Sequence, residues 1–334
     1  MIRRLCAVMG VVAMLTLTAC STAVAGSPAA GGGTGDTGSA DSAPGFDECG
    51  VVDLAELAEW LEVDSMYVTS AEVMVNSYGI RQATCTYYPA DHPGATGVKL
   101  TYAPGVDPET YFDQWEKNYD NRIPLEVGDR AETIGLANPE IDLKIYLVHA
   151  IKGTVGVDLF YSFDSSGKEE NGMPVVEEGA KKFTTLLNAV FERLPEELDI
   201  QDGEPEGPCA DIDLDQADET LQSELTTART VQRDDGAFNC VFGGESGRLE
   251  VSLAKPGKAP QNLTHGDVGD GALIRVDQAG GGSTQGNLNA WVAVGDNIVR
   301  VTAAYGNDVS GITEARPEDV EFVRAIVEAV GGQD

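Results

Sequence analysis

A cysteine at the end of an apolar segment is the residue of this chain best placed for covalent chemistry. Two arginines at residues 3 and 4 precede an apolar run over residues 7–17, and the stretch Leu17-Thr18-Ala19-Cys20 follows. Basic residues, a short apolar run and small residues in this order are typical of a signal for export, and the run is too short for a permanent transmembrane helix. This order of residues therefore predicts where the protein is found, outside the cytoplasm.

The segment Leu17-Thr18-Ala19-Cys20 resembles the processing signal of bacterial lipoproteins. The resemblance implies that residues 1–19 are a signal peptide, and that Cys20 becomes the first residue and carries fatty acyl chains such as palmitate. Residues 20–45 are almost wholly Ser, Thr, Ala, Gly, Pro and Asp, which favours a flexible tether. We therefore expect a protein anchored by the Cys20 lipid to the extracytoplasmic face of the cell membrane.

Four further cysteines follow the tether, at Cys49, Cys85, Cys209 and Cys240. Their spacing is too wide for the paired clusters of a zinc site, and an even number outside the cytoplasm indicates disulfides. We predict the pairs Cys49 with Cys85 and Cys209 with Cys240, against two other possible pairings. No metal site is expected.

Residues for enzyme chemistry are sparse. The chain has three histidines, His92, His149 and His265, and no nucleophile elbow or phosphate-binding loop beside a strand. His149 lies in an apolar strand run, which predicts a hydrogen-bonded core residue. Residues 211–215 resemble the start of a calcium loop. The loop's essential glycine would fall at Gln216 and its final glutamate at Gln222, so Asp213 is interpreted as a helix cap instead. We expect no catalytic residue and no cofactor.

The two halves of the chain share a pattern around their cysteines. Cys49 and Cys209 are each followed four residues later by an aspartate, Asp53 or Asp213, and then by apolar residues at helical spacing. The second cysteine of each half lies in a β-prone run, residues 83–88 or 237–242, and a further strand is expected at residues 98–102 and 249–253.

The match resumes at Val127-Gly128-Asp129-Arg130-Ala131 and Val268-Gly269-Asp270-Gly271-Ala272. A predicted hairpin follows in each half, over residues 145–161 and 288–303. A last helix is predicted from apolar residues at offsets of 0, 3, 4 and 7. These residues are Phe183, Leu186, Leu187 and Val190 in the first half, and Val323, Ile326, Val327 and Val330 in the second.

These patterns predict an α+β fold of two similar domains, each an antiparallel sheet with an N-terminal and a C-terminal helix and one disulfide. The first domain covers residues 46–195, an acidic linker covers residues 196–208, and the second domain covers residues 209–334. The chain resembles actinobacterial cell-envelope lipoproteins built on a small disulfide-bearing domain of unknown function, here in tandem. That resemblance implies an envelope location and carries over no catalytic residue.

The first half contains a predicted helical insertion at about residues 108–124, which the second half lacks. Its aromatic residues Tyr111, Phe112, Trp115 and Tyr119 have helix-like spacing. The favoured interpretation is the buried face of an extra helix, and the alternative is the lining of a ligand cleft. If a ligand binds here, we expect Tyr111 and Tyr119 to contact it.

Charge limits the partners. The chain has 55 acidic and 22 basic residues, a formal net charge of −33, which excludes nucleic acid and disfavours anionic headgroups as partners. We expect a non-catalytic binding or scaffold module of the cell envelope, whose partner is an envelope protein or an apolar or glycan ligand. The alternative is an envelope hydrolase whose carboxylate pair meets only in the folded chain.

Overall fold

The computed structural model describes residues 46–75, 79–90, 97–119, 121–138, 143–164, 176–233, 235–254, 260–278, 286–306 and 311–331. The predicted signal peptide, the tether with Cys20, and His92 lie outside these residues. The described chain divides into two compact units, which we call the first unit (residues 46–71 and 75–201) and the second unit (residues 72–74 and 202–331). No helix among the described residues is long and apolar enough to cross a membrane.

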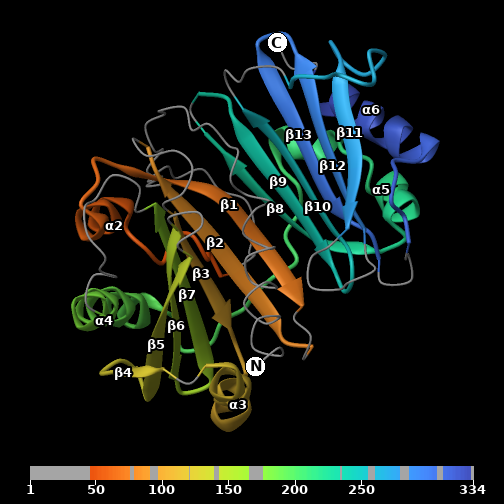
Figure 1. Cartoon of the computed structure of the whole chain (residues 1–334). Coiled ribbons are helices and arrows are strands. Elements are labelled where there is room, and N and C mark those ends of the chain that lie inside the picture. Colours follow the sequence, from red (N-terminus) through yellow and green to blue (C-terminus); the bar gives the residue numbers. More distant parts are fainter. Residues whose placement is uncertain are drawn as a thin grey trace, which may run out of the picture. The chain divides into compact units, whose positions relative to one another are not determined.

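The first sheet has seven strands in the order β1-β2-β3-β7-β6-β5-β4 (Figure 1). Neighbouring strands from β2 to β4 pair antiparallel, and β6 and β7 form the predicted hairpin. The strands are β1 (Met66–Val75), β2 (Arg81–Pro89), β3 (Gly97–Ala103), β4 (Ile123–Leu125), β5 (Arg130–Asn138), β6 (Leu143–Lys152) and β7 (Val155–Asp164).

Two helices, α2 (Leu54–Leu61) and α4 (Val176–Arg193), lie on the same side of this sheet (Figure 1). The ring of Phe183 on α4 lies 5.1 Å from Tyr146 of β6 and 5.8 Å from Trp60 of α2. The four apolar residues predicted for α4 are all buried, which confirms the predicted helical periodicity.

The second sheet has six strands in the order β11-β12-β13-β10-β9-β8. All neighbours pair antiparallel. The strands are β8 (Leu225–Gln232), β9 (Phe238–Gly244), β10 (Arg248–Ala254), β11 (Ala272–Gln278), β12 (Gly286–Val294) and β13 (Asn297–Ala304). The core of this unit is one cluster of buried apolar side chains between the sheet and the helices α5 (Leu214–Leu221) and α6 (Pro317–Gly331).

Read from β8 and from β1, the two sheets have the same strand order, apart from the short extra strand β4. The capping prediction is confirmed in both halves. The carboxylate of Asp53 accepts hydrogen bonds from the backbone N–H groups of Ala55 and Glu56, and that of Asp213 accepts from the N–H of Gln216. The structure is thus α+β, with two antiparallel sheets and two disulfides.

The shared Gly-Asp motif has a structural role. Gly128 and Gly269 both have a φ of 57°, in the left-handed region that favours glycine. The next residue, Asp129 or Asp270, accepts a hydrogen bond from the backbone N–H of the glycine in the following hairpin turn, Gly153 at 2.6 Å or Gly295 at 2.7 Å. The motif therefore ties the start of β5 in the first half, and of β11 in the second, to the turn of the following hairpin.

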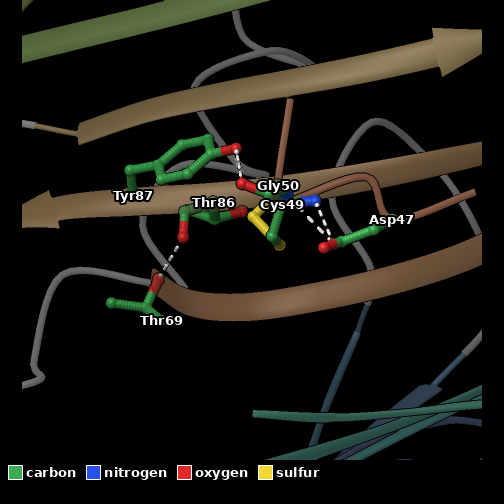
Figure 2. Close-up of a disulfide and its surroundings, with 7 residues drawn as sticks. Asp47, Cys49, Gly50, Thr69, Thr86 and Tyr87 are labelled. Atoms are coloured by element: carbon green, nitrogen blue, oxygen red, sulfur yellow. Dashed lines mark hydrogen bonds between the residues drawn. A yellow bond between two sulfur atoms is a disulfide. The ribbon is translucent and has the colours of Figure 1, made fainter. Parts of the chain in front are cut away.

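Both predicted disulfides are present, with Cys49 bonded to Cys85 and Cys209 to Cys240. Figure 2 shows the first of them: the carboxylate of Asp47 accepts hydrogen bonds from the N–H groups of Cys49 and Gly50, and the hydroxyl of Tyr87 donates to the carbonyl of Cys49. The second bond starts in the 3-10 helix η1 (Gly207–Asp211). Each disulfide therefore joins the segment before the first helix to the second strand.

The acidic segment at residues 196–208 packs more closely than its composition predicts. Leu198 and Ile200 are buried, and the two units divide between residues 201 and 202. Beyond that point the carbonyl of Asp202 accepts a hydrogen bond from the N–H of Ala228, and the N–H of Glu206 donates to the hydroxyl of Thr230, both on β8. Its second part therefore runs along the edge of the second sheet.

Candidate ligand-contact site

The insertion predicted to be helical at about residues 108–124 contains a shorter helix, α3 (Pro108–Asn118), and its end belongs to the strand β4 (Ile123–Leu125). It begins at Asp107, whose carboxylate accepts hydrogen bonds from the backbone N–H and the hydroxyl of Thr110. These two bonds lower the pKa of Asp107, because they stabilise its ionised form. Pro108 takes the first helical position, where its fixed φ suits the helix and its missing N–H has no intrahelical partner to lose.

Helix α3 packs on the face of the first sheet opposite to α2 and α4. His149 of β6 lies there, since it is three residues from Tyr146 and side chains alternate along a strand. The ring of Tyr111 stacks on the imidazole of His149 at 3.7 Å between centroids, and the ring of Trp115 stacks on it at 5.0 Å. Phe112 meets the same imidazole edge-on at 4.9 Å. We call these four residues together with Asp158 the His149 cluster.

Both nitrogens of His149 have partners inside this cluster. Nδ1 pairs with the carboxylate of Asp158, and Nε2 lies 2.9 Å from the carbonyl oxygen of Tyr111. The hydroxyl of Tyr111 donates to the same carboxylate at 2.8 Å. A carbonyl oxygen only accepts, so Nε2 carries a proton, and the charged imidazolium satisfies both partners.

The electrostatic balance favours that charged form. Burial opposes the charge, but the negative charge and hydrogen bond of Asp158 outweigh it, with help from the Tyr111 carbonyl and Glu132. The pKa of His149 is therefore raised above its ordinary value of 6.5. A histidine held protonated, with both nitrogens engaged, is unsuited to act as a general base.

A second charged group borders the cluster. Arg130 of β5 lies over the ring of Phe112 at 3.9 Å from its centroid and pairs with the carboxylates of Glu116 and Glu132. The hydrogen bond from Arg130 lowers the pKa of Glu116. A general acid of a glycosidase needs a raised pKa, so Glu116 does not have the electrostatics of that role.

The two tyrosines predicted to contact a ligand differ in their surroundings. Tyr111 is half-buried, its hydroxyl is bound to Asp158, and its ring lies against Gly156, where an added Cβ would come within 2.5 Å of the ring. Tyr119 ends α3, is half-buried, and lies 4.8 Å from the ring of Trp115. The favoured interpretation of the insertion, a helix packed on its own core, fits Tyr111, Phe112 and Trp115.

A second cluster was not among the predicted site residues. In the second unit, Trp291 of β12 has the guanidinium of Arg275 (β11) at 5.1 Å and that of Arg300 (β13) at 5.8 Å from its ring centroid. The available signal was the alternation of polar with apolar residues in β12 and β13. The meeting of the two arginines with Trp291 depends on how β11, β12 and β13 pair, and that register could not be predicted from the sequence.

Three or more histidine, cysteine or acidic side chains do not come together as a possible metal site anywhere in the described part of the chain. The aspartates of residues 211–215 serve other roles there, with Asp213 capping α5. Comparison of the chain with protein-family models, with characterised proteins and with solved structures gave no match.

Proposed function

We propose that the protein is a lipoprotein held on the extracytoplasmic face of the cell membrane by a lipid on Cys20, and that it acts there as a non-catalytic binding or scaffold module. In this proposal the two α+β units are tandem copies of one domain with an N-terminal and a C-terminal helix. Their shared strand order, disulfide placement and Gly-Asp motif support a repeat.

The observation that carries the proposal is the pair of disulfides. Every cysteine of the described chain is oxidised, and structural disulfides persist mainly outside the reducing cytoplasm. An exported chain with a cysteine directly after a short apolar run and small residues fits lipid attachment at that cysteine.

A binding role is favoured over catalysis by the His149 cluster. The imidazole of His149 has the chemistry of a catalytic base, yet both of its nitrogens are engaged: Nε2 binds the Tyr111 carbonyl of α3, and Nδ1 pairs with Asp158 of β7. The hydrolase alternative needs a carboxylate with a raised pKa beside a second one. Beside the His149 cluster the pKa of Glu116 is shifted the other way by Arg130, and the Asp218 carboxylate, whose pKa burial raises, accepts a hydrogen bond from the backbone N–H of Leu225.

The test is metabolic labelling with an alkyne fatty acid in a bacterial host that processes lipoproteins. We expect the wild-type chain to be labelled and shortened, and Cys20→Ser to remain an unlabelled precursor, because its hydroxyl is a poor nucleophile for the transfer of a diacylglyceryl group to the side chain. Cys6→Ser is the matched control, since it removes a thiol inside the signal peptide and should leave labelling intact. Equal labelling of Cys20→Ser would contradict the lipoprotein assignment.

A further inference from the structure

The two halves place different residues at one equivalent position of their sheets. His149 lies three residues before the end of β6 and faces Asp158 across the hairpin. Trp291 lies three residues before the end of β12 and faces Arg300 across its hairpin. The equivalence is fixed by the hairpin turns, where Lys152 pairs with Val155 and Val294 pairs with Asn297.

In the first unit this position is covered by the chain itself. Helix α3 stacks Tyr111 and Trp115 on His149, while its acidic residue Glu116 pairs with Arg130. A helix with acidic and aromatic side chains thus covers this part of the first sheet.

In the second unit no helix takes that place among the described residues between β10 and β11, which are residues 260–271. The side chain of Arg275 is 52% exposed, and Trp291 is half-buried. Arg275 uses its Nε on Asp277 at 2.9 Å, and a guanidinium has further N–H donors for a second carboxylate. Beside it, the side-chain oxygen of the buried Asn289 accepts no hydrogen bond from the described residues.

Two cations, Arg275 and Arg300, lie at this surface beside one carboxylate, that of Asp277. Cations are scarce in a chain with 22 basic and 55 acidic residues, yet two arginines converge on one tryptophan ring. At physiological salt the Debye length is about 8 Å, so a ligand at this surface responds mainly to these near charges. Arginine and tryptophan are also the residue types that most often dominate binding at protein interfaces.

We infer that the surface formed by Arg275, Trp291 and Arg300 next to the buried Asn289, here called the Trp291 face, docks an acidic, aromatic polypeptide segment of another protein. The inference deepens the proposed binding function and rests on it. A carboxylate of the partner pairs with the exposed guanidinium of Arg275, and an aromatic side chain packs beside Trp291, as the aromatic residues of α3 pack on the first sheet.

The test measures binding of the full-length protein in detergent to an immobilised copolymer of glutamate and tyrosine at 0.15 M salt. We expect Arg275→Gln to weaken binding about tenfold, because it removes one charge pair with the polymer. Arg324→Gln is the matched control: Arg324 also pairs with carboxylates of the second unit, Asp267 and Glu321, but lies on α6. It should change the affinity less than twofold.

Thermal unfolding of each variant checks that the fold is kept. Arg275 is chosen over Arg300 because it is more exposed, so its substitution disturbs the fold less. Absence of binding by the wild-type protein, or equal loss in Arg275→Gln and Arg324→Gln, would overturn the inference. Tighter binding of polygalacturonate than of the copolymer would also overturn it, in favour of an acidic glycan. Labelling at Cys20 is measured separately, so failure here leaves the membrane anchor unaffected.

Discussion

At the scale of single residues, the His149 cluster links packing to charge. The imidazole is nearly enclosed, with 11% of its side chain exposed, and it is stacked on both Tyr111 and Trp115. Its hydrogen bonds to Asp158 and to the Tyr111 carbonyl are satisfied together only when the ring is protonated. The docking of α3 therefore depends on one protonation state.

This dependence predicts a loss of stability at high pH. Because the folded-state pKa of His149 is raised above its ordinary value of 6.5, its contribution to stability is fully present below pH 6.5 and is lost as the pH rises through the folded-state pKa. Urea midpoints measured from pH 5.5 to 9 should fall over that window in the wild-type protein. His149→Gln should flatten the fall, whereas the control His265→Gln should keep it. A pH profile identical in both variants would contradict the assignment.

A residue in a left-handed conformation offers a second test at this scale. Gln222 ends α5 with a φ of 52°, a region where a side chain costs about 1 kcal/mol relative to glycine. Gln222→Gly should therefore raise the free energy of unfolding by up to about 1 kcal/mol. Glu62, at the same place after α2, is a less clean site because it pairs with Lys182. A lower urea midpoint in Gln222→Gly would refute the argument.

At the scale of elements, α3 is attached to the sheet by a few aromatic contacts. Phe112 is buried with Ala103, Val106 and Ile151, and Trp115 packs against this small cluster. This small cluster is separate from the core that lies between the first sheet and the helices α2 and α4. The helix is thus expected to respond to single truncations more sharply than a helix of the main core.

Trp115→Ala should lower the free energy of unfolding by about 2–4 kcal/mol, as truncation of a large packed aromatic does. Tyr119→Ala, at the C-cap of the same helix, should cost less than half as much. Urea unfolding measures both. An unchanged midpoint for Trp115→Ala would instead favour a binding role for the insertion.

The elements were predictable where a local rule decides them. The caps at Asp53 and Asp213 and the buried stripes of α4 and α6 follow from spacing alone. The strands β1, β5, β8 and β11 were not predicted; in β1 and β8, polar residues interrupt the alternation of apolar residues that identifies a strand. The meeting of His149 with α3, and of Trp291 with Arg275, was also beyond prediction, since it depends on strand register and on which face an inserted helix covers.

At the scale of the whole molecule, two compact units of similar strand order each carry one disulfide. Each bond closes a loop of 36 or 31 residues that contains the first helix and first strand of its half. Restricting the unfolded chain in this way stabilises a domain by about 4 kcal/mol in the chain-entropy model.

The paired substitution Cys209→Ala with Cys240→Ala should therefore destabilise the second unit by about 4 kcal/mol. Hydrogen exchange followed by mass spectrometry should show faster exchange in β8 to β13, while β2, β3 and β5 to β7 keep their protection. The reciprocal pair Cys49→Ala with Cys85→Ala should reverse the pattern. Equal acceleration throughout the chain in both variants would contradict separate stabilisation of the units.

The position of the first disulfide also has a mechanical consequence. A pulling force applied to the chain ahead of Phe46, as a membrane tether would apply it, reaches Cys49 after three residues and passes through the covalent bond to Cys85 in β2. Helix α2 and strand β1 lie inside the closed loop, so they bear none of that load. Reduction of this one bond would redirect the force into α2, and the unit would yield from its first helix.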